Sequence, residues 1–302
     1  MIFEQFKGAF APLPTPFTLK DRAINFDLIR QHLEFLNARG IQGVVVLGTN
    51  GEFPSLAIEE RRNVLSWVMK FRGKLKVIAQ TGSCSFVETI GLSDFASEIG
   101  ADALLISAPY YFKNISTIGL IDYFWEILSR TRLPAFLYNM PQNTQVAIGH
   151  EVIQRLMAFK HLLGLKDSTG EWNITRGYIE SFRPLHIFVG NDSLLESGLE
   201  AGAGGSITAI TNSLPELVME VYRSVPQSDY RKFAQQRLSA VRKLLQDLPI
   251  HAATKFILYL RGFEESAVRP PLQNLSEAQK LQLERSLTDL GIEFQDDQIV
   301  LK

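Results

Sequence analysis

The amino-acid sequence predicts an α/β fold, namely a (β/α)8 TIM barrel followed by a small three-helix subdomain. Short apolar runs, typical of strands buried on both faces, alternate eight times with amphipathic helical segments over about 220 residues. After residue 225 only helical patterns follow. An open doubly wound sheet is the alternative, but it normally has fewer strands and more often shows a phosphate-binding glycine motif after its first strand. The predicted units are a barrel of residues 1–225 and a helical subdomain of residues 226–302.

The predicted strands follow from their apolar runs. They lie at residues 8–17, 43–48, 76–82, 103–109, 135–139, 162–168, 186–190 and 205–210. The first run carries Pro12, Pro14 and Pro16, and proline removes a backbone donor that the centre of a sheet needs. We therefore expect the first strand to be short or irregular at its end.

The predicted helices follow from apolar residues at spacings of three, four and seven, which lie on one helix face. Residues 58–71 show this pattern, and so does the segment between the fourth and fifth runs. Residues 229–248, 251–263 and 276–290 are the three helices of the subdomain. The last one opens with a capping box formed by Ser276 and Gln279.

Composition narrows the class of protein. The chain has 302 residues, 46% hydrophobic and 21% charged, with a net charge of -1 and no basic stripe, so neither nucleic acid nor an anionic membrane is an expected partner. Cys84 is the only cysteine, and the five histidines lack zinc-ligand spacing. We expect a cytoplasmic protein with no metal, no cofactor, no signal peptide and no transmembrane segment.

Lys166 ends the sixth apolar run and is the residue around which the functional prediction is built. A lysine there must reach water, pair with a carboxylate or lose its proton. If burial lowers its pKa, the neutral amine becomes a nucleophile that can form a Schiff base with a ketone. The alternative is a structural lysine whose ammonium reaches solvent or pairs with Asp167.

Two other strand ends would face Lys166, because barrel enzymes carry their sites at the carboxyl ends of the strands. Thr49 and Asn50 lie between two glycines, in a turn whose backbone N–H groups could hold a carboxylate. Tyr138 ends the fifth run, where a phenol can transfer protons. A plain tight turn and a half-buried aromatic residue are the alternatives. Together the three groups form a workable Schiff-base site for a 2-oxo acid.

Three stretches in this order resemble the dihydrodipicolinate synthase / N-acetylneuraminate lyase superfamily of class I aldolases. They are Gly48-Thr49-Asn50-Gly51-Glu52, Tyr138-Asn139-Met140-Pro141 and Gly164-Leu165-Lys166-Asp167-Ser168. The resemblance covers essentially the whole chain. It implies that Lys166 forms the Schiff base with pyruvate, that Tyr138 transfers protons, and that Thr49 and a neighbouring subunit's Tyr111 complete the proton relay.

The resemblance also implies a binding site and an assembly. The backbone of Thr49 and Asn50 would hold the pyruvate carboxylate, and Ile207 would present its carbonyl near the site. Ser168 and Asn143 lie in the loops that would select the second substrate. A homo-oligomer, a dimer or a tetramer, is implied as well.

Two positions depart from the family pattern. Asn50 stands where a second hydroxyl residue is usual, and its amide can still donate to a carboxylate. Asn143 stands where the synthase branch has an arginine that binds the carboxylate of aspartate semialdehyde. We therefore expect an aldolase acting on pyruvate and a 2-oxo-3-deoxy acid. The alternatives are 4-hydroxy-tetrahydrodipicolinate synthase, a keto-deoxy sugar acid dehydratase and a non-catalytic 2-oxo acid binding relative.

Overall fold

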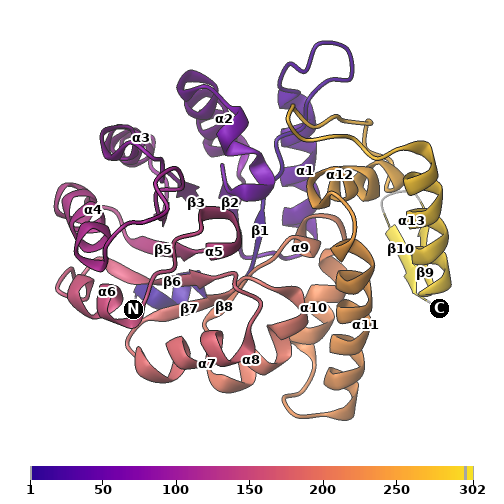
Figure 1. Cartoon of the computed structure of the whole chain (residues 1–302). Coiled ribbons are helices and arrows are strands. Elements are labelled where there is room, and N and C mark those ends of the chain that lie inside the picture. The colour runs from indigo at the N-terminus through magenta and orange to yellow at the C-terminus, as the bar shows by residue number, and fades with distance from the viewer. Residues whose placement is uncertain (1, 296–297, 302) are drawn as a thin grey trace.

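The protein folds around a closed barrel of eight parallel strands, as Figure 1 shows for a computed structural model of the chain. The structure describes residues 2–295 and 298–301. The strands are β1 (Gly8–Pro12), β2 (Gly43–Val46), β3 (Lys76–Gln80), β4 (Ala103–Ser107), β5 (Ala135–Asn139), β6 (Leu162–Asp167), β7 (His186–Val189) and β8 (Gly205–Ile207). Each strand pairs with the next in the chain, and β8 closes on β1. The predicted fold class is confirmed.

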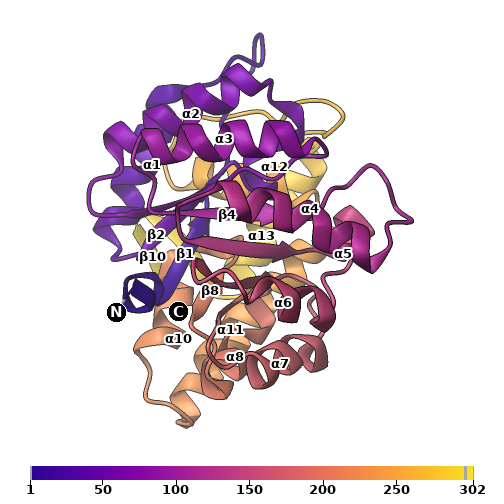
Figure 2. The same cartoon turned by 90° about the vertical axis from the view of Figure 1, so that its left-hand side faces the viewer.

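Helices surround the strands in a ring (Figure 2). The helices of the barrel are α1 (Phe26–Ala38), α2 (Ile58–Phe71), α3 (Phe86–Glu98), α4 (Thr117–Arg130), α5 (Pro141–Thr144), α6 (His150–Leu156), α7 (Trp172–Ser181), α8 (Leu195–Ala201), α9 (Ile210–Ser213) and α10 (Pro215–Arg223). Short 3-10 turns lie at Ile2–Phe6, Thr49–Gly51, Phe53–Ser55 and Asp192–Leu194. The helices cover strands that are buried along almost their whole length, which is why the strand runs are continuously apolar.

Aromatic side chains fill the interior of the barrel. Phe10, Phe136 and Phe188 pack edge to face at centroid distances of 5.1–5.4 Å. The turn before β1 adds Phe6, whose ring lies 5.4 Å from that of Phe136. Phe6 therefore closes the amino-terminal end of the barrel, and the carboxyl ends of the strands are left for a site.

The first strand ends earlier than residue 17, and the prolines explain where. After Pro12 the chain makes one further bond to β2, from Leu13 N to Val45 O at 2.9 Å. Pro14 and Pro16 then carry no N–H to continue a ladder. The expectation of a short first strand is confirmed.

Three helices follow the barrel, and Figure 1 shows them together on one side of it, beyond α1 and α10. They are α11 (Asp229–Gln246), α12 (Ile250–Leu260) and α13 (Glu277–Asp289). The predicted capping box of α13 is present, since Ser276 and Gln279 bond each other's backbone N–H groups. An antiparallel hairpin of β9 (Ile292–Gln295) and β10 (Gln298–Leu301) follows, which sequence analysis did not predict. In the described residues, no helix is long and apolar enough to span a bilayer.

Candidate active site

The register between β5 and β6 creates the centre of the site. Tyr138 pairs with Lys166, and Asn139 pairs with Asp167. Because side chains alternate between the two faces of a strand, the first pair faces one side and the second pair faces the other. Tyr138 belongs to the cluster that fills the barrel, so Lys166 beside it points inward as well.

The Asp167 carboxylate forms its hydrogen bonds outside the site. Its carboxylate accepts hydrogen bonds from Asn139 Nδ2 at 2.9 Å, Thr169 Oγ1 at 2.8 Å and Thr175 Oγ1 at 2.6 Å. The structure therefore contradicts the alternative in which Asp167 pairs with Lys166. The alternation of the strand separates these two neighbours in sequence.

Lys166 lies at the bottom of a cavity. The residue is only 4% exposed, and its Nζ lies 4.1 Å from the centroid of the Tyr138 ring. Within residues 2–295 and 298–301, no carboxylate lies within ion-pair distance of this amine. A buried amine that faces a phenol and has no carboxylate partner is suited to nucleophilic attack.

The Tyr138 phenol is held for proton transfer. Its Oη lies 3.2 Å from Thr49 Oγ1. Burial alone would raise the pKa of Tyr138, but the Lys166 charge and hydrogen bonds with Thr49, Lys166 and Ser168 outweigh burial and lower the pKa below its ordinary value. A phenol with a lowered pKa gives up and regains a proton more easily near neutral pH.

The turn after β2 supplies donors for an anion. Leu47 and Glu52 adopt left-handed backbone conformations, with φ of 64° and 54°, on either side of the 3-10 turn Thr49–Gly51. The first N–H groups of such a turn have no partner within it. Asn50 is 8% exposed, and its buried Nδ2 has no hydrogen-bond partner. An unpaired buried donor that lines a cavity is suited to a carboxylate ligand.

Side chains of helix α12 contact this turn and hold it in place. Lys255 Nζ lies 2.5 Å from Glu52 Oε1, and both side chains are almost fully buried. Glu52 Oε2 accepts the Arg269 N–H at 2.9 Å, and His251 Nε2 donates to Thr49 O at 3.0 Å. Sequence analysis did not predict these contacts, because they join segments about 200 residues apart in the chain.

One cavity of about 280 Å³ gathers seven of the eight predicted site residues. They are Thr49, Asn50, Tyr138, Asn143, Lys166, Ser168 and Ile207. The C-terminal helices add Arg242, Leu245 and Gln246 to the same wall. Sequence analysis missed Arg242, since nothing in the pattern of α11 marks the side chain that faces the barrel.

Tyr111 is the predicted residue that this cavity does not include. It is 74% exposed and packs edge to face against Phe112 at 5.3 Å. Its predicted role requires a neighbouring subunit, and that role stays a prediction.

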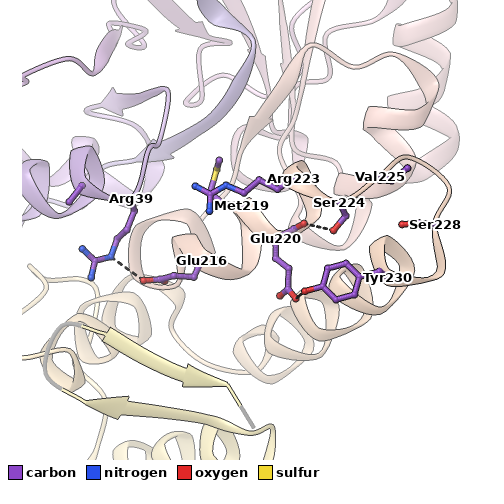
Figure 3. Close-up of a pocket in the computed structure, with 10 residues that line it drawn as sticks. Arg39, Glu216, Met219, Glu220, Arg223, Ser224, Val225, Ser228 and Tyr230 are labelled. Carbon is purple, nitrogen blue, oxygen red and sulfur yellow. Dashed lines mark hydrogen bonds and ion pairs between the residues drawn. The ribbon is translucent and has the colours of Figure 1, made fainter.

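A larger cavity of about 760 Å³ lies elsewhere, beside α10 and the end of α1 (Figure 3). Its acidic side chains are already paired: Glu216 with Arg39 at 3.0 Å and Glu220 with Tyr230 at 2.7 Å. It contains none of the predicted site residues. In the described part of the chain, no group of three or more His, Cys, Asp or Glu side chains is arranged to hold a metal ion.

Fold and site together define a class, that of barrel lyases and aldolases, and comparison with known proteins agrees. Residues 5–290 match the Dihydrodipicolinate synthetase family. A DapA-like lyase of Chloroflexus aurantiacus is 37% identical over 89% of this chain and 92% of its own length. The 4-hydroxy-tetrahydrodipicolinate synthase of Methanopyrus kandleri is 33% identical over 95% and 97%.

Solved structures agree on the fold. The crystal structure of YagE, an E. coli prophage protein in complex with pyruvate, superposes with a TM-score of 0.89 at 27% identity, covering 94% of this chain and 98% of its own. This chain belongs to the Dihydrodipicolinate synthetase family. The predicted membership is confirmed.

Proposed function

We propose that this protein is a class I aldolase that forms a Schiff base between Lys166 and pyruvate, and that it makes or cleaves a 2-oxo-3-deoxy acid. The observation that carries the proposal is the juxtaposition of the buried Lys166 amine and the Tyr138 phenol, 4.1 Å from Nζ to ring centroid. The complex of the relative YagE with pyruvate supports the same ligand class.

The reaction begins at the keto carbon. The neutral Lys166 amine attacks C2 of the 2-oxo acid, and Tyr138 donates a proton to the oxygen, which leaves as water. The resulting iminium draws electrons from the bond between C3 and C4. That bond breaks as the 4-hydroxyl loses its proton to Tyr138, and an aldehyde departs. Tyr138 then passes that proton to C3 of the enamine, which restores the iminium. Addition of water to C2 releases pyruvate and the free lysine, and the proton set free returns to Tyr138.

The carboxylate of the 2-oxo acid is assigned to the turn after β2. The amide of Asn50 and the backbone N–H groups of Thr49 and Asn50 would donate to it. Ile207, Ser168 and Asn143 line the rest of the cavity and would contact the remainder of the substrate. No step needs a cofactor, because the iminium itself accepts the electrons.

The synthase alternative needs another cation for the carboxylate of its second substrate. Asn143 lines the cavity where the family resemblance expects an arginine for the carboxylate of aspartate semialdehyde. An amide cannot replace the bidentate, charged contact that arginine makes. A coupled assay with that aldehyde separates the two reactions.

Reductive trapping tests the proposal directly. Borohydride added with pyruvate should raise the intact mass by about 72 Da, the mass of one reduced imine, and the adduct should map to Lys166. The Lys166→Ala variant should remain folded, lose the adduct and lose turnover. Lys160→Ala removes an exposed lysine and serves as the matched control. Turnover retained by Lys166→Ala would refute the mechanism.

A homo-oligomer is part of the proposal. Tyr111 and Phe112 are 74% and 69% exposed, which suits side chains that a second subunit covers. In such an assembly Tyr111 would enter the neighbouring subunit's site and complete the relay through Thr49 and Tyr138.

A further inference from the structure

The charged side chains of the active-site cavity are of one sign. Among the residues that line it, only Lys166 and Arg242 carry charge, and none is Asp or Glu. The other polar side chains around its mouth are neutral amides: Gln142, Asn143, Asn191 and Gln246. The cavity therefore favours a ligand with negative charge.

Arg242 lies on α11 and is partly buried in the cavity wall. In the part of the chain that the structure describes, its guanidinium makes no hydrogen bond and no ion pair within 4 Å. Arg237, on the same helix, differs in this respect because it lies 3.6 Å from Glu220. A half-buried guanidinium without a close partner is suited to bind a ligand anion.

Asp192 is the acidic group that Arg242 influences from a distance. This carboxyl is 2% exposed and lies outside the residues that line the cavity. Burial raises the pKa of Asp192 to about 6, against the opposing effects of Thr208 and the Arg242 charge. Arg242 thus favours the ionised form of Asp192, and within the described residues its five donors have no close hydrogen-bond acceptor.

The substrate of the proposed reaction places no charged group beside Arg242. When Lys166 forms the iminium, its positive charge is balanced by the carboxylate of the bound 2-oxo acid. The charge of Arg242 then has no counterpart in a substrate whose far end is neutral. A partly buried guanidinium whose donors are unused gains from a charged acceptor, and a second acidic group on the substrate would supply one.

We propose that Arg242 binds a second acidic group of the substrate, a carboxylate or a phosphate, at the end of the molecule away from the 2-oxo acid. This inference rests on the proposed Schiff-base function. Under this proposal the substrate is a 2-oxo acid with a second acidic group. The aldehyde fragment carries that second group. Arg242 would thus be a specificity-determining residue contributed by the C-terminal helix α11 to the same cavity as the uncharged Asn143.

A matched pair of 2-oxo acids that cannot be cleaved tests this role. 2-Oxoadipate and 2-oxohexanoate have the same six carbons and differ only in a terminal carboxylate or methyl group. Each competes with pyruvate for trapping by borohydride, and the competition gives its apparent dissociation constant. The proteins compared are the wild type, Arg242→Met, Arg242→Lys and the control Lys243→Met, which removes an exposed cation from the same helix.

The wild type and Lys243→Met should bind 2-oxoadipate about 30-fold more tightly than 2-oxohexanoate, the factor that corresponds to one hydrogen bond between charged groups. Arg242→Met should bind both about equally, and the quantity compared between proteins is the ratio of the two dissociation constants. Arg242→Lys should keep part of the preference. A merely structural arginine would weaken both competitors alike.

A third competitor, 2-oxo-5-phosphonopentanoate, distinguishes phosphate from carboxylate as the second acidic group. Tighter binding than 2-oxoadipate, lost in Arg242→Met, would identify a phosphorylated substrate. Absence of any preference for a charged end in the wild type, or its persistence in Arg242→Met, would overturn the proposal while leaving pyruvate trapping intact. If pyruvate itself is not trapped, the proposed function fails, and the role of Arg242 fails with it.

Discussion

At the scale of single residues, the site depends on which way neighbouring side chains point. Lys166 and Asp167 are adjacent in sequence, yet β6 directs the amine into the barrel and the carboxylate toward Asn139, Thr169 and Thr175. An inward Asp167 would form an ion pair with Lys166 and hold its proton. The alternation of one strand is thus what leaves the amine without a carboxylate partner.

Replacing Tyr138 by Phe should slow turnover by about 10²–10⁴-fold, the range for loss of a general acid–base group. The ring and its packing remain, so pyruvate trapping at Lys166 should still occur, though more slowly. Because the pKa of Tyr138 lies below its ordinary value of 10.0, the turnover rate of the wild type should change with pH below that value. The rate of Tyr138→Phe should not show this change. An unchanged kcat in steady-state assays would contradict the assignment.

The relative positions of such residues could be predicted from the sequence where a strand end fixes them. Tyr138 and Lys166 end neighbouring strands, so their meeting follows from the fold class alone. Arg242 could not be found in this way, because the angle at which α11 packs on the barrel decides which of its side chains reaches the cavity. That angle depends on tertiary packing that no local pattern encodes.

At the scale of elements, the turn after β2 and helix α12 act as one unit. Glu52 holds the end of the turn in a left-handed conformation and pairs with the buried Lys255, while His251 holds the Thr49 carbonyl. Burial lowers the pKa of Lys255 to about 8, against the opposing charge of Glu52. The C-terminal helices therefore fix the geometry of the donors assigned to the substrate carboxylate.

Removal of one member of this pair should destabilise the protein strongly. Glu52→Gln leaves the Lys255 charge buried without a counter-charge, which costs about 3–5 kcal/mol of unfolding free energy. Combining it with Lys255→Met should restore part of that loss, because no unpaired charge remains. Urea unfolding of the two single variants and the double variant measures the coupling. Strictly additive losses would show that the pair is not coupled.

The boundaries of most elements agree with the sequence patterns to within a few residues, and the differences have local causes. The prolines after Pro12 shorten β1, and β2, β3, β4 and β8 each end two or three residues before the predicted run does. The hairpin of β9 and β10 escaped prediction because it is short and separate from the barrel, so no neighbouring strand reinforces its pattern.

At the scale of the whole molecule, buried histidines make stability depend on pH. His32 is 3% exposed and donates from Nε2 to Asn212 O at 2.9 Å. Burial, helped by the charge of Arg261, lowers the pKa of His32 to about 4. Between pH 6.5 and 4 the unfolded chain therefore binds a proton at His32 that the folded chain does not, so stability falls as the pH falls.

The His32→Gln variant isolates this effect. From pH 7 to pH 5 the wild type should lose about 2 kcal/mol more unfolding free energy than the variant, given the separation of the two pKa values. His186, with a pKa lowered to about 4, acts in the same direction, and Asp192, with a pKa raised to about 6, acts in the opposite one. Both are present in both proteins, so their effects cancel in the comparison of urea midpoints. Equal acid sensitivity would contradict the prediction.

The ring of Phe6 closes the amino-terminal end of the barrel, and this has a kinetic consequence. A cavity closed at one end has a single entrance, so two reactants that both reach Lys166 cannot arrive or depart independently. In the reaction proposed above, the 2-oxo acid that bonds to Lys166 would have to enter before the aldehyde. In the direction of cleavage, the aldehyde would leave first and pyruvate last. Phe6 thus leaves one route for both reactants, so the proposed reaction would have to pass them in sequence and not from opposite ends of the barrel.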